Sequence, residues 1–107
     1  MKVLVTDDAA DFRLYLRVLL QRWGYQVVEA ADGQEALVCL EANDIRLVVS
    51  DWMMPGMSGP DLCRAARATD LGHYVYIILL TGRSDSADLV EGLDAGADYF
   101  VTKPYEA

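Results

Sequence analysis

Five short apolar segments alternate with amphipathic segments along this chain, and this alternation limits the fold more than any other feature. The short segments are rich in β-branched residues and have the length of strands. We expect strands at residues 2–6, 26–29, 47–51, 74–80 and 99–101. The apolar residues between them recur at helical spacing, which predicts helices at residues 12–23, 32–40, 59–66 and 84–95. This alternation predicts an α/β fold, with a parallel sheet, helices on both faces and right-handed crossovers.

The composition restricts the class of protein. A chain of 107 residues fits one domain. The net charge of −8 and the nine scattered basic residues argue against direct nucleic-acid binding, which needs clustered Lys and Arg. No apolar run approaches the ~20 residues of a membrane span, and the first residues enter a strand instead of a signal peptide. We therefore expect a cytoplasmic protein without a membrane contact, in which Cys39 and Cys63 are buried small hydrophobic residues.

Polar residues stand at the ends of four predicted strands. Asp7-Asp8 follow the first strand, Asp51 ends the third, Thr81 ends the fourth and Lys103 follows the fifth. In a parallel sheet these ends share one edge, and a doubly wound order of 2-1-3-4-5 would place the first and third strands side by side. The three aspartates would then meet. Taken alone, Asp51 is better explained as a strand-ending residue that accepts bonds from loop amides, and only its neighbours favour a chemical role.

Three carboxylates in a small space repel one another. Two unit charges ~5 Å apart cost roughly 3 kcal/mol at an effective dielectric constant near 20, so the cluster must take up protons or a cation. Ligands that are all oxygen, with no His or thiolate nearby, suit Mg²⁺. Carboxylates also form aspartyl phosphates, and Asp51 is the candidate nucleophile. The cation and Lys103 would balance the added negative charge.

Four motifs give the chain its resemblance to a known family. They are Asp7-Asp8, the segment DWMMPGMSG at residues 51–59, Thr81-Gly82 and the segment GADYFVTKP at residues 96–104. In this order and at these strand ends, the chain resembles a response-regulator receiver domain of two-component signalling. The resemblance implies a flavodoxin-like doubly wound sheet of five strands in the order 2-1-3-4-5, with a fifth helix. Only three residues follow Pro104, so we expect a piece of a longer chain. The alternative is that another domain or protomer covers the face of that helix.

The resemblance also implies the metal ligands and the phosphate donor. Asp51 would accept a phosphoryl group from the phosphohistidine of a histidine kinase or a phosphotransfer domain. Asp8 and Asp51 would bind Mg²⁺ directly, Asp7 mainly through water, and the Met53 carbonyl would be a further ligand. Such a domain is a signalling switch that catalyses only its own phosphorylation and slow dephosphorylation.

The resemblance implies a relay as well. Lys103 would pair with the phosphoryl oxygens, the Thr81 hydroxyl would move toward the phosphate and Phe100 would turn inward. A cis Lys103-Pro104 bond is expected. The sequence departs from the commonest family pattern at Gly82, where Ala is usual, and at Phe100, where Tyr is more frequent and could form a hydrogen bond.

Met53 and Arg83 occupy the two positions that flank the phosphoryl group in the family. An apolar Met53 should hinder an attacking water, whereas Arg83 could screen the phosphate or hold it. We therefore expect the phosphorylated state to last minutes or longer.

Two other functions stay open. The first is a phosphatase of the haloacid dehalogenase type, which needs a second acid two positions after the nucleophile, where this chain has Met53. The second is an interaction module that works without phosphorylation. For the receiver, the sequence predicts a downstream effector domain or protein that it cannot name, and it allows a homodimer.

Four residues outside the motifs look structural. Trp23 ends the apolar stripe of the first helix, so we expect it in the core. His73 lies in a loop without an acidic or thiol neighbour in sequence, and we expect it to be exposed. Arg13 and Arg17 lie four apart and predict a solvated helix face. The resemblance offers one alternative, a kinase docking surface beside Asp7-Asp8.

Overall fold

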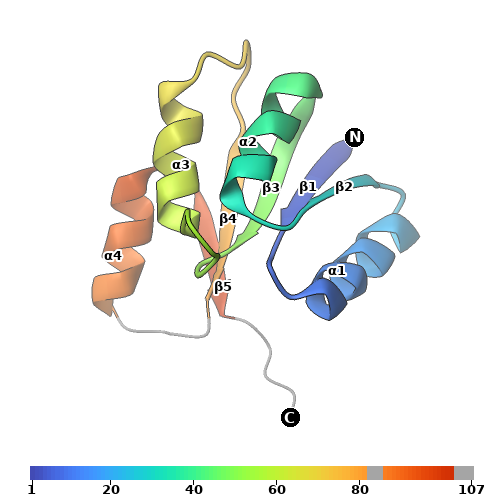
Figure 1. Ribbon diagram of the computed structural model, residues 1–107, viewed down its shortest axis with the longest axis horizontal. Coiled ribbons are helices and arrows are strands. Elements are labelled where there is room, and N and C mark those ends of the chain that lie inside the picture. Colours follow the sequence, from blue (N-terminus) through green and yellow to red (C-terminus); the bar gives the residue numbers. More distant parts are fainter. Residues whose placement is uncertain (82–85, 103–107) are drawn as a thin grey trace.

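The computed structural model describes residues 1–81 and 86–102. Its strands are β1 (Lys2–Thr6), β2 (Gln26–Ala30), β3 (Ile45–Asp51), β4 (Tyr76–Thr81) and β5 (Tyr99–Thr102). Its helices are α1 (Ala10–Arg22), α2 (Gly33–Ala42), α3 (Gly59–Ala68) and α4 (Ser86–Ala95). All strand pairs are parallel, in the order β2-β1-β3-β4-β5 (Figure 1). The predicted fold class is confirmed.

The starts of α2 and α3 follow from local capping chemistry. The Asp32 carboxylate accepts a hydrogen bond from the Glu35 amide at 2.8 Å, which caps α2. At α3, Ser58 and Asp61 form a reciprocal capping box, and Pro60 lies in the first turn, where no amide hydrogen is needed. The two helices that follow β2 and β3 therefore begin at defined residues, which fixes the loops before them.

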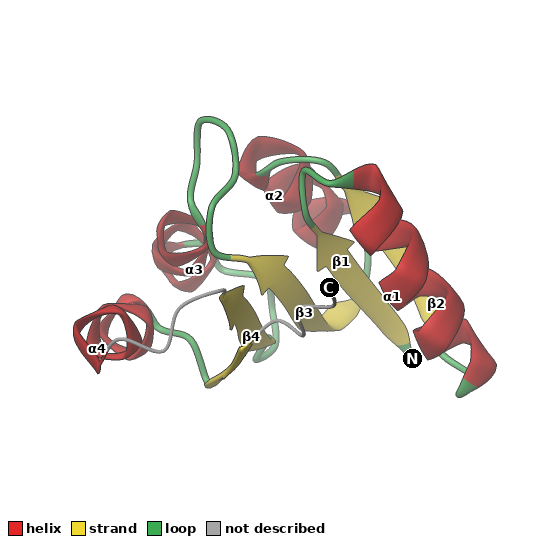
Figure 2. Cartoon of the chain, turned by 90° about the horizontal axis from the view of Figure 1, so that it is seen from below, coloured by secondary structure: helices red, strands yellow, loops and turns green. Residues whose placement is uncertain are grey.

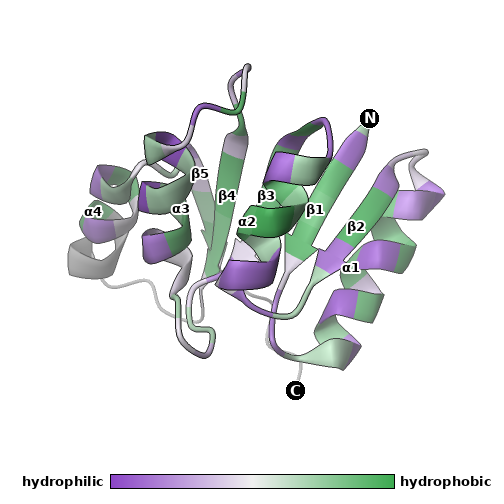
Figure 3. Cartoon of the chain, turned by 45° about the horizontal axis from the view of Figure 1, so that its top comes forward, coloured by the Kyte–Doolittle hydropathy of each residue, from purple (hydrophilic) through white to green (hydrophobic). Residues whose placement is uncertain are grey.

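The two faces of the sheet are covered unequally. Figure 2 shows α1 beside β1 and β2, away from α3 and α4. The larger core cluster includes Leu4, Val48 and Leu79 and packs under α2, α3 and α4, whereas a smaller one around Val5 and Leu80 packs against α1. Apolar residues dominate the strands and form stripes on the helices (Figure 3). No residue of α1 is fully buried.

Trp23 contradicts the expectation of a core residue, because its side chain is 68% exposed. The helix ends at Arg22, and Trp23 takes the C-cap position with φ −94° and ψ 8°, which is not helical. A residue beyond the last helical turn no longer follows the helical repeat, so the apolar stripe stops at Leu20.

Arg67 on α3 forms hydrogen bonds at the amino edge of the sheet, where the strands begin. Its guanidinium donates to the Gly96 carbonyl at 2.7 Å, to the Val75 carbonyl at 2.6 Å and to the Asp98 carboxylate at 2.8 Å. The Tyr74 hydroxyl donates to the same carboxylate, and the guanidinium lies over the Tyr74 ring, 4.6 Å from its centroid. We call these residues the Arg67 clamp. It joins α3, the start of β4 and the α4–β5 link at the edge opposite the strand ends that carry Asp51 and Thr81.

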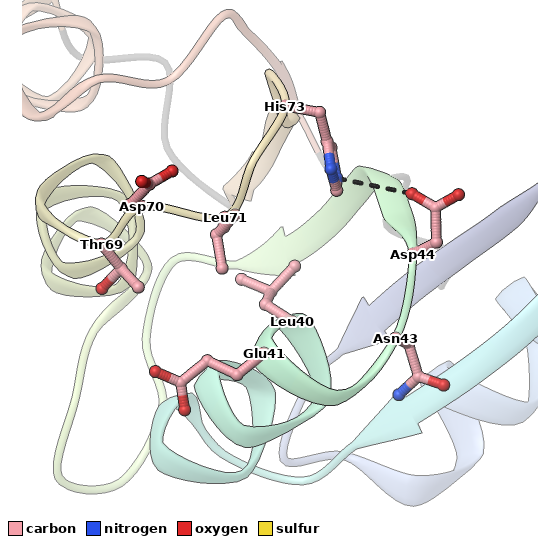
Figure 4. A pocket seen from close by; sticks show the side chains of 8 residues that line it. All are labelled: Leu40, Glu41, Asn43, Asp44, Thr69, Asp70, Leu71 and His73. Carbon is pink, nitrogen blue, oxygen red and sulfur yellow. Dashed lines mark ion pairs between the residues drawn. The ribbon is translucent and has the colours of Figure 1, made fainter.

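A pocket of about 450 Å³ opens at the same amino edge (Figure 4). It is lined by Leu40, Glu41, Asn43, Asp44, Thr69, Asp70, Leu71 and His73. The sequence predicts an exposed His73, and this is wrong: the side chain is 18% exposed, and its Nε2 lies 2.9 Å from the Ile45 carbonyl and 3.7 Å from Asp44. Both neighbours stand at the start of β3, far from His73 in sequence, so only the pairing of β3 with β4 brings them together.

Candidate functional site

Three carboxylates converge where β1 and β3 end. Asp7 and Asp8 directly follow β1, and Asp51 is the last residue of β3, which pairs with β1 through Thr6 and Ser50. One carboxylate oxygen from each aspartate lies within 4.8 Å of the others. Asp7 and Asp51 are buried, with 1% and 8% exposure, whereas Asp8 is exposed. The parallel order thus gathers acids that are more than forty positions apart.

Short backbone contacts orient the two buried carboxylates. The Ala9 amide donates to Asp7 Oδ1 at 2.9 Å, and the Trp52 amide donates to Asp51 Oδ1 at 2.9 Å. Each aspartate therefore accepts an amide from the loop that follows its strand, as the strand-ending alternative for Asp51 anticipates. This structural role and a chemical role are compatible, because a carboxylate has two oxygens and about four acceptor sites.

The donor set of this acidic centre fits a hard divalent cation. All three side chains offer oxygen, and neither His nor Cys takes part. Among the side chains that the structure describes, at residues 1–81 and 90–102, it is the one place where three or more His, Cys, Asp or Glu residues bring ligand atoms this close. Oxygen ligands at a partly open edge favour Mg²⁺ or Ca²⁺ over zinc or copper. Met53, two residues after Asp51, has a side chain that is 68% exposed.

The loop after Asp51 is hydrogen-bonded to β4, to the start of α3 and to β1. The Trp52 amide donates to the Leu80 carbonyl at 2.9 Å, and the Trp52 carbonyl accepts the Gly59 amide at 2.8 Å. Met54 is buried, and its sulfur accepts the Thr6 hydroxyl at 3.3 Å. These contacts keep the main chain on both sides of Asp51 in place.

Gly59 is packed directly against Asp51. A Cβ at this position would lie 2.5 Å from the Asp51 carbonyl oxygen and 2.9 Å from a Leu79 methyl group. Real Cβ atoms do not approach backbone oxygens so closely. The glycine of the DWMMPGMSG segment therefore permits the close approach of α3 to the end of β3.

Thr81 and Phe100 lie at the positions that the topology predicts. Thr81 ends β4, one residue beyond the pairing of Asp51 with Leu80, and is 2% exposed. Phe100 on β5 is half-buried and packs against the larger core cluster. Other predictions fall outside the described residues: those for Lys103, for Gly82 and Arg83, and for a cis Lys103-Pro104 bond.

The expectation of a solvated face is wrong for Arg13, whereas the Arg17 side chain is 40% exposed. The Arg13 side chain is 18% exposed; its Nη1 donates to the Asp7 carbonyl at 2.6 Å, and its Nε lies 3.3 Å from Glu29 Oε1. Arg17 Nη1 lies 2.9 Å from Glu29 Oε2. We call these three residues the Arg13–Glu29–Arg17 network. The sequence signal for this network was Glu29, one residue before the end of β2. This strand pairs with β1 and brings the Glu29 carboxylate to the first turns of α1.

The fold and this edge together define a doubly wound, flavodoxin-like α/β domain with an acidic centre where its strand order reverses. Residues 3–107 match the model of the response regulator receiver domain. The chain belongs to this family, whose members are signalling proteins and not classical enzymes.

Two relatives illustrate the match. The probable transcriptional regulator ycf27 of Cyanophora paradoxa is 42% identical over 104 residues, which cover 97% of this chain and 42% of that protein. The DNA-binding response regulator MtrA of Mycobacterium tuberculosis is 39% identical over 105 residues, which cover 98% and 45%. The chain spans less than half the length of these curated relatives.

Solved structures agree with the fold. The chemotaxis protein CheY4 of Vibrio cholerae superposes with a TM-score of 0.91 at 33% identity, covering 98% of this chain and 88% of that one. A putative response regulator from Chloroflexus aurantiacus gives a TM-score of 0.90 at 32% identity, with coverage of 98% and 86%. In the part of this chain that the structure describes, no helix is long and apolar enough to span a membrane.

Proposed function

We propose that the chain is a phosphorylation-dependent switch in which Asp51 accepts a phosphoryl group from a phosphohistidine of a histidine kinase or phosphotransfer domain. The observation that carries this proposal is the convergence of carboxylate oxygens from Asp7, Asp8 and Asp51 within 4.8 Å. Such a cluster is costly unless a cation offsets its repulsion, so its presence at a ligand-binding edge of the sheet needs a chemical reason.

We assign the metal to Mg²⁺. Asp8 and Asp51 would hold it directly, Asp7 through water, and the Met53 carbonyl would complete the protein ligands. When bound, the ion would offset the negative charge of the incoming phosphoryl group. The exposed Asp8 and the exposed Met53 leave this side of the centre open to a partner.

Phosphoryl transfer would use the oxygens of Asp51. Its Oδ1 accepts the Trp52 amide, which orients the carboxylate, and the other oxygen would attack phosphorus. A P–O bond forms, the P–N bond of the phosphohistidine breaks, and the histidine keeps the electron pair. Lys103 would pair with the new phosphate oxygens, since an acyl phosphate carries about one more negative charge than a carboxylate.

The switch would use Thr81 and Phe100. Thr81 stands at the end of the strand beside Asp51, so a short movement of its hydroxyl would bring a donor to the phosphate. Phe100 is half-buried on the next strand, where an inward rotation would fill space that Thr81 leaves. The phosphate can shift the two forms only by its differential interaction with them.

We further propose that residues 1–107 are the receiver domain of a longer protein, because curated relatives of more than twice this length carry names of transcriptional regulators. An effector domain or protein would receive the signal. The charge of −8 argues that this domain does not itself contact DNA. A cytoplasmic location and a homodimer stay predictions.

The test is phosphorylation by acetyl phosphate in the presence of Mg²⁺, followed by intact-mass spectrometry. We expect one added phosphoryl group, which disappears in Asp51→Asn and when EDTA removes the metal. Asp44→Asn is the matched control, because Asp44 is an exposed aspartate at the opposite edge, and it should behave as the wild type. An unchanged mass would favour the phosphorylation-independent module, and repeated turnover of acetyl phosphate would favour a phosphatase.

The lifetime of the phosphorylated state tests the role of Met53. We expect minutes or longer, because an apolar side chain at this position would hinder an attacking water. Decay of the purified phosphoprotein within seconds would contradict this expectation. Met53→Asp, which adds the acid that the dehalogenase class needs, should shorten the lifetime.

A further inference from the structure

We propose that Arg13 is a positioning residue of the acidic centre: it holds the Asp7-Asp8 main chain where their carboxylates can share one divalent cation with Asp51. This inference rests on the proposed function. It assigns a role to a residue that contacts neither the phosphoryl group nor the metal.

The main chain of Asp7 and Asp8 belongs to no regular element. β1 ends at Thr6, and α1 begins at Ala10. The Asp7 amide reaches the Ala30 carbonyl at 3.3 Å, and the Asp7 side chain accepts the Ala9 amide from within the same link. The Arg13 guanidinium adds a short bond of 2.6 Å to the Asp7 carbonyl, next to the peptide bond that leads to Asp8. This bond ties the link to the first turns of α1; Figure 1 shows the link running from β1 into that helix.

Arg13 is itself fixed from β2. Glu29 accepts Arg13 with one carboxylate oxygen and Arg17 with the other, at 3.3 and 2.9 Å. The backbone amide of Arg13 bonds to the Ala9 carbonyl at 3.0 Å, so both ends of the residue are anchored. A planar guanidinium with a partner at Nε and another at Nη1 has little freedom to rotate. The Arg13–Glu29–Arg17 network thus connects the acidic centre to two elements that carry none of its ligands.

The bond from Arg13 counters the repulsion among the three carboxylates. Before a cation binds, the repulsion among the three carboxylates pushes the residue 7–9 link away from Asp51. The bond from a guanidinium that is itself held by Glu29 restricts that movement. The centre is then arranged before the metal arrives, and binding does not have to order the link.

The charge of Arg13 and its position predict opposite effects of its removal on the affinity for Mg²⁺. The three charges of the network leave one net positive charge beside the acidic centre. Removing a positive charge alone would strengthen the attraction of the acidic centre for Mg²⁺. Removing an anchor would weaken Mg²⁺ binding, since supporting residues outside the ligand set typically affect metal affinity by about 10- to 100-fold. The direction of the change therefore decides between the two effects.

The experiment measures the dissociation constant for Mg²⁺ by the emission of Trp52, whose amide bonds to Asp51. A Trp23→Phe background removes the signal of the exposed Trp23. We expect Arg13→Gln to weaken Mg²⁺ binding by about tenfold and to slow phosphorylation by acetyl phosphate in parallel at low Mg²⁺. Saturating Mg²⁺ should restore most of the rate.

Arg17→Gln is the matched control. It removes the same charge from the same Glu29 but keeps the bond from Arg13 to Asp7, so its Mg²⁺ affinity should stay within about twofold of the wild type. Urea unfolding without metal establishes that each variant is folded. Should Arg13→Gln not fold, Arg13→Lys keeps the charge but not the fork of donors, and it should also bind Mg²⁺ more weakly.

Unchanged or tighter Mg²⁺ binding in Arg13→Gln would overturn the inference, and so would an equal loss in Arg17→Gln. In both cases wild-type phosphorylation would leave the proposed function intact. A wild-type protein that neither binds Mg²⁺ nor takes up phosphate would overturn both.

Discussion

Gly59→Ala would place a methyl group where the chain has no room for one. The new Cβ would stand 2.5 Å from the Asp51 carbonyl oxygen, 2.9 Å from Leu79 and 3.2 Å from the Trp52 Cα. Two of these three neighbours are backbone atoms, which cannot move aside as the end of a side chain can. The strain would fall on Asp51, the proposed phosphoacceptor, and on Trp52.

The cost follows from two opposing terms. Overpacking a tight site costs about 1–3 kcal/mol, and Ala gains up to about 1 kcal/mol over Gly in helix propensity. Because Gly59 is the first residue of α3, only part of that gain applies. We expect a net loss of about 1–2 kcal/mol in the free energy of unfolding. For a domain of this size, each kcal/mol lowers the melting temperature by roughly 4–8 °C.

Gly92→Ala is the matched control. It adds the same methyl group to another buried glycine, in α4, where the nearest atoms belong to the side chains of Trp52 and Leu79 at 3.0–3.2 Å. Those side chains need to move only a few tenths of an ångström, and the position inside the helix gains the full propensity term. We expect its stability to stay within about 1 kcal/mol of the wild type.

Urea unfolding gives both stabilities, and intact-mass kinetics with acetyl phosphate give the effect on Asp51. We expect Gly59→Ala to be both less stable and more slowly phosphorylated, whereas Gly92→Ala keeps the wild-type rate. A Gly59→Ala protein with the stability and phosphorylation rate of Gly92→Ala would refute the account of this contact.

Four further outcomes follow from the structure. Burial raises the pKa of Cys63 to about 11, so at about pH 8 a thiol reagent should modify Cys39 first and Cys63 only on unfolding. Because the folded-state pKa of Cys63 exceeds the unfolded value of 9.0, its contribution to stability is present below pH 9.0 and is lost as the pH rises toward 11, which urea titrations across that range would detect. Asp32→Ala removes the cap of α2 and should lower the free energy of unfolding by about 1 kcal/mol, measured against Asp44→Ala. Trp23→Phe changes an exposed side chain and should alter that free energy by less than about 0.5 kcal/mol; a larger loss would mean that the ring is packed.

Hydrophobic periodicity predicts the elements of the fold well, and the errors have local causes. The first strand is found at its predicted bounds. The fourth is predicted from residue 74 but begins at Tyr76, because the Tyr74 hydroxyl is bonded to Asp98 in the Arg67 clamp and pairing starts at the register of Tyr76 with Leu47. An apolar run shows where a strand can form, but side-chain contacts from distant elements decide where it starts.

The acidic centre could be predicted because it depends on topology alone. Once parallel strands are inferred, residues at their carboxyl ends must share an edge. The environment of Arg13 could not be predicted in this way, because it depends on the rotation of α1 about its axis, which decides whether the guanidinium reaches Glu29 on β2. A spacing of four on a helix says that two arginines share a face, but not which neighbour that face meets.

The Arg67 clamp and the acidic centre lie at opposite ends of the same strands. At the amino ends of the strands, direct bonds between protein groups join the elements. At the carboxyl ends, three carboxylates concentrate negative charge. Damage to each should therefore leave a different signature in a screen of random variants. Changes around Arg67 should reduce how much protein accumulates in cells, and changes of the Asp7, Asp8 and Asp51 carboxylates should yield abundant protein that no longer transmits a signal.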